Sequence, residues 1–351
     1  MNKTILDFKS FNKKDLKILF VGDIMGNIKM METVTNGNDP FKHISKFFDR
    51  YDLRIGNLET TFSNEVSDYP RFSSDDRFAT LLANYFDVLF TANNHCHDYS
   101  NEGIIRTIKT LDSKEILHVG TNKPGDRKKT LRMEVNGHEL AIMSYTTFVN
   151  GEIIGKDETG LQFAEYDSKQ DTKGLINFYS ETKVEEEIHS AETRAEIIIV
   201  GVHGGAEYDR EKKDSQEQRV GAILRRGGDI VIGGHPHVFQ GGFQQDKKFG
   251  VYSLGNFFTD QHKLNNSDSG CIFCVKIDPM GEYSYSFLPI CTFIHATEGH
   301  KVLPLSLVEQ GYYNFIGNDD RKTLLTALGE IRKTMLDQGL TEEPFFLHLA
   351  C

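Results

Sequence analysis

Short apolar runs recur along this chain, and each gives way to a polar segment before the next run begins. Such runs, rich in Ile, Leu, Val and Phe, are typical of buried strands, and the amphipathic stretches between them have helical spacing. This alternation favours βα units and an α/β fold. The predicted strands are Lys17–Gly22, Leu53–Gly56, Val88–Ala92, Ile116–Val119, Leu140–Tyr145, Ile197–Val202, Ile230–Gly233, Gly250–Leu254 and Gly270–Ile277.

The amphipathic stretches predict helices, and the Gly227-Gly228 pair is a suitable C-cap for one of them. These helices are Phe41–Tyr51, Asp75–Tyr85, Ser100–Leu111, Glu181–Arg194 and Asp214–Arg226. Gly-rich and charged stretches near 120–130 and 150–175 are predicted to be loops. From about residue 300 the pattern changes to one helix, Asp319–Gln338, and a tail. We therefore expect a catalytic-type domain over residues 1–295 and a C-terminal extension, 296–351, packed on it.

The charge balance excludes one class of function. The 351 residues carry a formal net charge of −11, and no dense Lys/Arg stripe appears. General nucleic-acid binding is disfavoured, because it depends on neutralising phosphates with basic side chains. A phosphorylated substrate remains compatible, since bound metal ions can overcome a negative surface.

The five cysteines are scattered and odd in number, which favours a reduced, cytoplasmic setting. Cys271 and Cys274 have a zinc-like spacing, but they lie in a strand-like run without a second pair, so a structural role is preferred. The N-terminus lacks an apolar stretch typical of a signal sequence, and no run is long enough for a transmembrane helix. We expect a soluble protein.

Polar clusters directly after the apolar runs carry potential metal ligands. Asp23 ends the first run, where an unpartnered charge would be costly, although a turn or helix-capping role is the alternative. After the second run, Asn57 and Glu59 compete for one role. A carboxylate bridges two cations better than an amide does, so Glu59 is preferred as the ligand and Asn57 as its support or a substrate contact.

The segment Gly233-Gly234-His235-Pro236-His237 is the sharpest of these clusters. His235 and His237, held by a rigid proline, can present two imidazoles to adjacent metals from one turn. His203 follows another apolar run and is favoured as a ligand over a buried structural histidine. Glu207 and Tyr208, four and five residues later, are candidates for the pocket, with plain structural roles as the alternative.

The cluster Asn93–Asp98 follows one predicted strand and precedes a helix. Asn94 would supply a neutral oxygen ligand, and His95 could face the substrate as a general acid or charge stabiliser. Asp98 either orients His95 or caps the helix that follows, with the cap preferred, and His97 is expected at the surface. Because ligands of open α/β sheets bind beyond the carboxyl ends of strands, these distant clusters should meet at one edge.

The order of these motifs resembles the CapA-like proteins of bacterial capsule synthesis, which look like a branch of the calcineurin-like metallophosphoesterases. The resemblance covers about residues 17–295 and rests on Gly22-Asp23, Gly56–Glu59, Ala92–Asp98, His203–Tyr208, Gly233–Gln240 and Tyr252–Phe257. It implies a four-layer α/β/β/α sandwich with His95 as the catalytic histidine. It also implies one or two divalent ions (Mn, Fe or Zn) held by Asp23, Glu59, Asn94, His203, His235 and His237.

Three positions depart from the pattern of the family. The first motif of related phosphoesterases usually reads Asp-x-His, whereas Met25 stands at the histidine position here. Gly204 replaces a favoured Trp, and Gly234 stands where His is frequent. Asn256, in the last motif, and Arg71, in a polar loop, are further candidates for contacting substrate or supporting the site. Typical capsule members also carry a membrane anchor, which we do not expect in this protein.

Three functions are compatible with these residues. The first is hydrolysis of a phosphoester on a small molecule or polymer, by a hydroxide held between two cations about 3.5–4 Å apart, with His95 assisting the leaving group. The second is a metal-binding, weakly or non-hydrolytic partner in poly-γ-glutamate or polysaccharide synthesis. The third is a carbohydrate-pathway enzyme that acts on a sugar phosphate.

Overall fold

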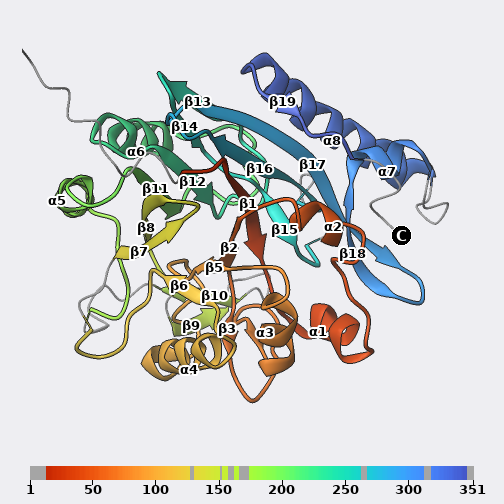
Figure 1. Cartoon of the computed structure of the whole chain (residues 1–351). Helices are drawn as coiled ribbons and strands as arrows, with labels where there is room; N and C mark the ends of the chain where they lie inside the picture. Colours follow the sequence, from red (N-terminus) through yellow and green to blue (C-terminus); the bar gives the residue numbers. More distant parts are fainter. Residues whose placement is uncertain are drawn as a thin grey trace, which may run out of the picture.

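The computed structural model describes residues 13–126, 130–150, 152–156, 162–165, 174–261, 267–311 and 318–345. Within them, two large β-sheets face each other (Figure 1). The first sheet has the order β18 (Gly299–Pro304), β17 (Tyr283–His295), β16 (Ser269–Ile277), β1 (Leu16–Ile24), β2 (Leu53–Leu58), β5 (Val88–Phe90) and β6 (Leu117–Val119), with β15 (Asn256–Phe258) beside β1 and β19 (Thr341–Glu342) beside β17. The second sheet has the order β13 (Gly242–Gln245), β14 (Lys248–Val251), β12 (Ile230–Gly234), β11 (Ile197–His203), β8 (His138–Thr146) and β7 (Thr130–Val135).

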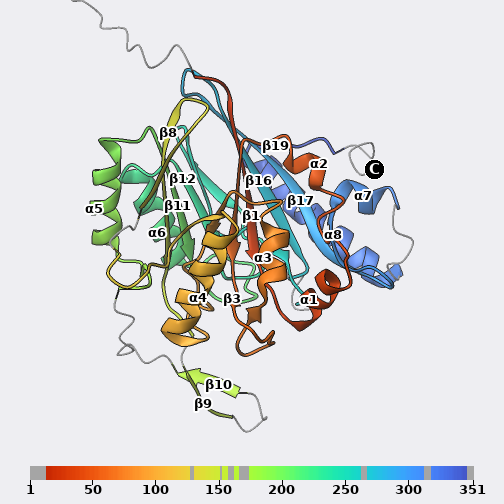
Figure 2. The ribbon, with the colours of Figure 1, turned by 60° about the horizontal axis from the view of Figure 1, so that its bottom comes forward.

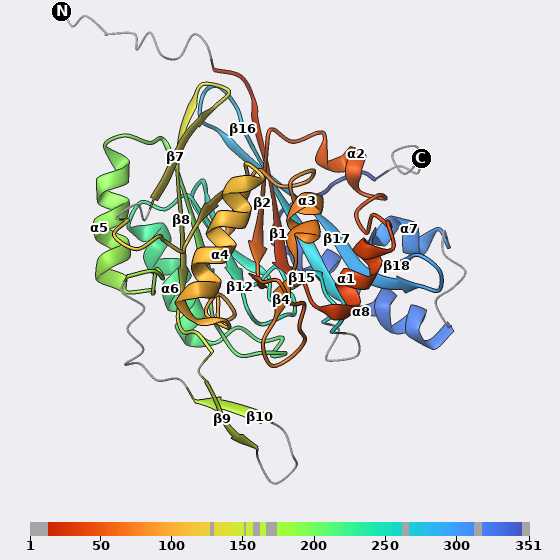
Figure 3. The same cartoon turned by 90° about the horizontal axis from the view of Figure 1, so that it is seen from below.

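Helices cover the outer face of each sheet. The first sheet is covered by α1 (Ile28–Thr35), α2 (Ser45–Phe48), α3 (Asp76–Leu82) and α4 (Ser100–Ser113). The second is covered by α5 (Glu181–Glu192) and α6 (Asp214–Arg225), which lie at one side of the molecule in Figure 3. The predicted α/β/β/α sandwich is therefore confirmed.

The alternation of side chains along each strand builds the layers. In β1, Phe20 belongs to the core between the sheets, whereas Leu19 and Val21 pack under the helices. In β11, Ile199 likewise faces the first sheet and Val200 faces α5 and α6. Strands buried on both faces read as continuous apolar runs, which explains why the sequence predicts them well.

The C-terminal part continues the first sheet. β18 pairs with β17, and α7 (Leu305–Glu309) and α8 (Asn318–Asp337) follow it. Apolar residues of α8, among them Leu328 and Met335, join the core cluster that includes β16 and β17. The division of the chain at residue 295 stays a prediction. None of the helices in the described ranges combines the length and apolar character that a membrane span needs.

Two predictions of local structure are wrong. The helix expected over Phe41–Tyr51 is only the short α2, because the turn before it already buries Phe41 and Ile44 and another turn follows Phe48. The stretch near 150–175, expected as a loop, contains the hairpin β9 (Glu152–Lys156) and β10 (Gln162–Glu165), which projects from the sandwich in Figure 2. A further small strand pair, β3 (Thr61–Phe62) and β4 (Ser73–Ser74), precedes α3.

Candidate metal centre

The carboxyl ends of strands from both sheets meet at one edge of the sandwich, and the predicted ligands lie there. Asp23 is near the end of β1, Glu59 directly follows β2, and Asn94 lies in the loop after β5. His203 ends β11, and the two histidines of the Gly-Gly-His-Pro-His segment follow β12. All six side chains are buried, none with more than 3% of its surface exposed.

Strand pairing brings these residues together. β11 and β12 run parallel with His203 opposite Gly234, and β1 and β2 run parallel with Asp23 opposite Asn57. Between Phe20 and Asp23 the register of β1 against β2 shifts, an irregularity of the kind that re-aims a side chain.

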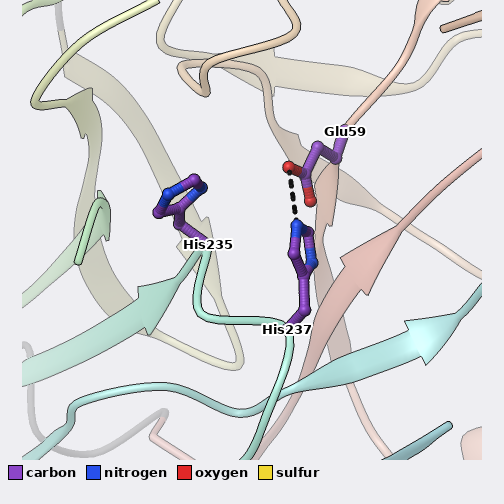
Figure 4. Close-up of side chains that lie close together, drawn as sticks. All are labelled: Glu59, His235 and His237. Carbon is purple, nitrogen blue, oxygen red and sulfur yellow. Dashed lines mark ion pairs between the residues drawn. The ribbon is translucent and has the colours of Figure 1, made fainter. Parts of the chain in front are cut away.

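Glu59 stands at the centre of two overlapping groups of ligand atoms. In one group, atoms of Asp23, Glu59 and His203 lie within 4.8 Å of one another. In the other, atoms of Glu59, His235 and His237 do the same (Figure 4). Glu59 Oε1 lies 3.5 Å from His203 Nε2 and 3.7 Å from His237 Nε2. One carboxylate therefore faces imidazoles from two different strand ends.

The buried polar atoms of this centre that lack a hydrogen-bond partner fit a divalent cation. Among the described residues, both carboxylate oxygens of Glu59 and Nδ1 of His235 are buried without a hydrogen-bond partner. A buried, unsatisfied carboxylate is costly unless a cation compensates it. Nitrogen and oxygen donors of this kind suit Mn, Fe or Zn.

Asn57 and Asn256 hold predicted ligands in place. Asn57 Nδ2 donates to Asp23 Oδ1 at 2.7 Å and lies 3.2 Å from His203 Nδ1, so its amide supports two predicted ligands. Asn256 Oδ1 lies 3.0 Å from His237 Nδ1, which leaves the opposite ring nitrogen facing Glu59. Such outer contacts fix the tautomer and the orientation of a ligating histidine.

The loop after β12 is strained at its two histidines. His235 has φ 95° and His237 has φ 59°, a region that non-glycine residues seldom adopt. The His235 N–H donates to Asp23 Oδ2 at 3.1 Å, and Tyr208 N donates to Pro236 O at 2.8 Å. These contacts hold both imidazoles toward the same centre.

Burial and neighbouring charges shift the pKa values of the centre in opposite directions. Burial lowers the pKa of His237, but the carboxylates of Glu59 and Asp23 outweigh it and raise this pKa to about 10. Burial and the surrounding imidazoles lower the pKa of His235 well below its usual value. Burial raises the pKa of Asp23, yet its contacts with His237 and His203 bring it below the ordinary value. Burial and the neighbouring charges therefore act on the two imidazoles in opposite directions.

His95 lies beside this centre and is held by Asp98. Its Nδ1 is 2.6 Å from Asp98 Oδ2, which also accepts the Phe72 N–H at 2.7 Å. Burial lowers the pKa of His95, but the Asp98 charge more than offsets this and raises it. The capping role preferred for Asp98 is wrong, since α4 begins after Tyr99 without a side-chain cap, and the Asp98 carboxylate contacts His95 instead. His97, expected at the surface, is instead buried against Asn101.

The sequence interpretation overlooked two residues of the loop after β8. Phe148 packs its ring 4.9 Å from that of His235, and Asn150 contacts both Asn94 and His95. The rule that polar side chains gather after strands could have found Asn150, because it follows the predicted strand Leu140–Tyr145.

A family model supplies the identification. The model described as bacterial capsule synthesis protein PGA_cap matches residues 17–261, which include every residue of the centre described above. The chain belongs to the PGA_cap family.

Two curated relatives of this PGA_cap protein have similar names. The chain is 30% identical over 284 residues to a capsule biosynthesis protein CapA of Bacillus anthracis, and the matched region covers 77% of this chain and 66% of that protein. It is also 30% identical over 278 residues to a PGA biosynthesis protein CapA of Bacillus subtilis (strain 168), and this match covers 75% of the chain and 68% of that protein. The match thus spans about two thirds of the length of each relative.

Solved structures resemble the chain more distantly. A hypothetical protein from Thermus thermophilus has a TM-score of 0.47 at 14% identity, covering 82% of this chain and 99% of that one. A putative 5'-nucleotidase from Staphylococcus aureus, in complex with alpha-ketoglutarate, has the same TM-score and identity, covering 90% and 58%.

The three unusual positions of this PGA_cap chain are accommodated by its own packing. Met25 is buried, and its sulfur accepts a hydrogen bond from Thr259 Oγ1 at 3.4 Å. A thioether therefore fills the position at which related phosphoesterases have an imidazole. A Cβ on Gly204 would lie 2.2 Å from Thr147 Oγ1, and one on Gly234 would lie 2.7 Å from Asp23 Oδ1. Larger residues at either glycine would require neighbouring side chains to move.

The remaining candidates lie farther from the ligand groups. The Tyr208 ring is 5.8 Å from that of His237, whereas Glu207 is exposed. Arg71 is also exposed, in the loop between β3 and β4, next to Phe72, whose ring lies 4.4 Å from His95. A direct role for Arg71 stays a prediction.

Proposed function

We propose that this PGA_cap protein is a metal-dependent phosphoesterase of capsule or cell-surface polymer biosynthesis. The observation that carries the proposal is the carboxylate of Glu59, which is buried without a hydrogen-bond partner between His203 and His237. A divalent cation is the partner that such a carboxylate lacks.

The centre would hold one or two ions through the six predicted ligands, with Glu59 shared between the two groups. Divalent ions in such a site lower the pKa of a bound water and neutralise phosphoryl oxygens. The protein's own contribution is to fix the donors: Asn57 orients Asp23, and Asn256 orients His237.

His95 is proposed to protonate the leaving oxygen of the substrate. Nδ1–H of the protonated ring donates to Asp98, which leaves Nε2–H to be delivered to the developing alkoxide. Phe72 packs against the ring and limits its movement. The Asp98 carboxylate stabilises the charged ring until the proton has moved.

The family and the two relatives named CapA support the link to capsule synthesis. We propose a phosphorylated small molecule or polymer as the substrate, with poly-γ-glutamate or polysaccharide synthesis as the setting. Four cysteines of the described residues are free thiols, which supports a reducing, cytoplasmic compartment: Cys96, Cys271, Cys274 and Cys291.

A second candidate is a metal-binding partner in polymer synthesis with weak or no hydrolysis. Met25 favours it, because a buried thioether occupies the place where related phosphoesterases have a histidine. One ion would then have fewer protein ligands and bind more weakly.

Elemental analysis of purified protein, combined with a phosphoesterase screen, separates the two candidates. Wild type and His237→Ala are loaded with Mn²⁺ and assayed on a panel of phosphomonoesters and phosphodiesters, with His189→Ala on the exposed face of α5 as a control. Hydrolysis by wild type and the control, but not by His237→Ala, is the expected result. Stoichiometric Mn²⁺ without turnover of any ester would favour the second candidate.

A further inference from the structure

Asn150 connects the two sheets at the metal centre. It lies in the loop after β8 of the second sheet, whereas Asn94 and His95 follow β5 of the first. Its backbone N–H donates to Asn94 O at 2.8 Å. Its neighbour Val149 is buried in an apolar cluster with Cys96, two residues beyond Asn94, so packing fixes the position of the loop.

The side chain of Asn150 contacts the nitrogen end of the Asn94 amide. Asn94 Nδ2 donates to Asn150 Oδ1 at 3.3 Å. The remaining end of that amide, Oδ1, therefore points to His203 and lies 2.7 Å from its Nε2. An amide turned the other way would present N–H groups, which cannot bind a cation.

The other end of the Asn150 side chain contacts His95. Asn150 Nδ2 lies 3.2 Å from His95 Nδ1 and 3.4 Å from His95 Nε2. One amide thus touches a predicted metal ligand with its oxygen and the predicted general acid with its nitrogen.

We infer that Asn150 is a positioning residue that holds the Asn94 oxygen toward the metal and sets the place of the His95 ring. The inference rests on the proposed function, because it assigns Asn94 as a ligand and His95 as the acid. Outer contacts of this kind typically change metal affinity or activity by about 10- to 100-fold when they are removed.

Two substitutions test the two ends of the Asn150 side chain separately. Asn150→Ala removes both contacts and should weaken Mn²⁺ binding by about tenfold or more. Asn150→Asp keeps an oxygen for Asn94 Nδ2, so Mn²⁺ affinity should return to the wild-type value or above it. The same variant places a second carboxylate beside His95, which should hold the proton on the ring, so kcat should stay low. A purely structural role would not produce this split.

Mn²⁺ titration by calorimetry, without substrate, measures the first effect independently of turnover, and circular dichroism checks folding. Asn136→Asp in the β7–β8 turn is the matched control, since Asn136 lies at the opposite end of β8 from Asn150 and its side-chain amide donates to the backbone oxygen of Asp15. If Asn150→Ala binds Mn²⁺ as tightly as wild type, the inference about Asn150 is wrong and the proposed function is unaffected. Wild type that binds Mn²⁺ but cleaves no ester overturns the proposed hydrolysis, while the affinity comparison still decides the role of Asn150. Wild type that binds no divalent metal overturns both.

Discussion

Nε2 of His203 lies 2.7 Å from Oδ1 of Asn94, although the two residues belong to strand ends in different sheets. Both atoms are potential ligands, so these two residues would help to hold a divalent ion between the sheets. His203→Ala should therefore weaken Mn²⁺ binding by about tenfold or more. Calorimetric titration checks this against His189→Ala, whose side chain is 85% exposed. Equal affinities in the two variants would remove His203 from the ligand set.

Glu59 should couple metal binding to stability. Glu59→Gln removes a carboxylate that, together with Asp23, raises the pKa of His237, so the metal-free protein should lose about 1–3 kcal/mol in free energy of unfolding. Added Mn²⁺ should stabilise wild type by mass action and leave the variant almost unchanged. Urea unfolding with EDTA and with Mn²⁺ measures both effects, with the exposed Glu186→Gln as the control. A variant stabilised by Mn²⁺ as strongly as wild type would contradict the bridging role.

His95 should act on turnover and not on metal retention. His95→Ala should lower kcat by about 10²–10⁴-fold, the usual contribution of a general acid, with unchanged Mn²⁺ content. Asp98→Asn should lower it less, because the ring stays in place but its charged form loses a carboxylate. Steady-state kinetics with metal analysis test both variants. Wild-type kcat in His95→Ala would refute the assignment.

His43 predicts a pH dependence of stability. Burial and the charges of Lys301 and Lys42 lower its pKa from 6.5 to about 4. Between these values the unfolded chain binds a proton that the folded protein does not, so stability falls as pH drops through that window. His43 should contribute a loss of about 1–2 kcal/mol between pH 7 and pH 5. Urea unfolding at both pH values should give a smaller difference for His43→Gln than for wild type or His189→Gln; an equal difference would contradict this.

Leu328 tests whether α8 is part of the main core. Its side chain is fully buried in the cluster shared with β16 and β17. Leu328→Ala should cost about 2–5 kcal/mol in free energy of unfolding, with one cooperative transition for the whole chain. Leu336→Ala on the same helix, 48% exposed, should cost much less. A separate early transition in the variant would instead favour an independently unfolding extension.

The strands were predictable because burial on both faces demands uninterrupted apolar runs, as in Ile197–Val202 and Ile230–Gly233. The convergence at the centre was predictable because parallel strands end at a common edge. The helix over Phe41–Tyr51 was not, since successive turns place Phe41, Ile44 and Phe48 against the sheet with a spacing that resembles a helix.

Contacts made across the two sheets could not be read from the sequence. The place of Asn150 after a strand could have marked it as a candidate, but its two contacts are with residues more than fifty positions away. The choice between capping and orienting for Asp98 also depended on where the His95 ring lies.

The shared position of Glu59 between histidines of the opposite sheet has a consequence for dissecting the molecule. Neither half of the sandwich carries a complete set of donors, so a split version of the chain should regain its chemistry only when both fragments reassemble. A divalent ion held by both halves would then report their correct pairing, and its removal by a chelator should weaken their association.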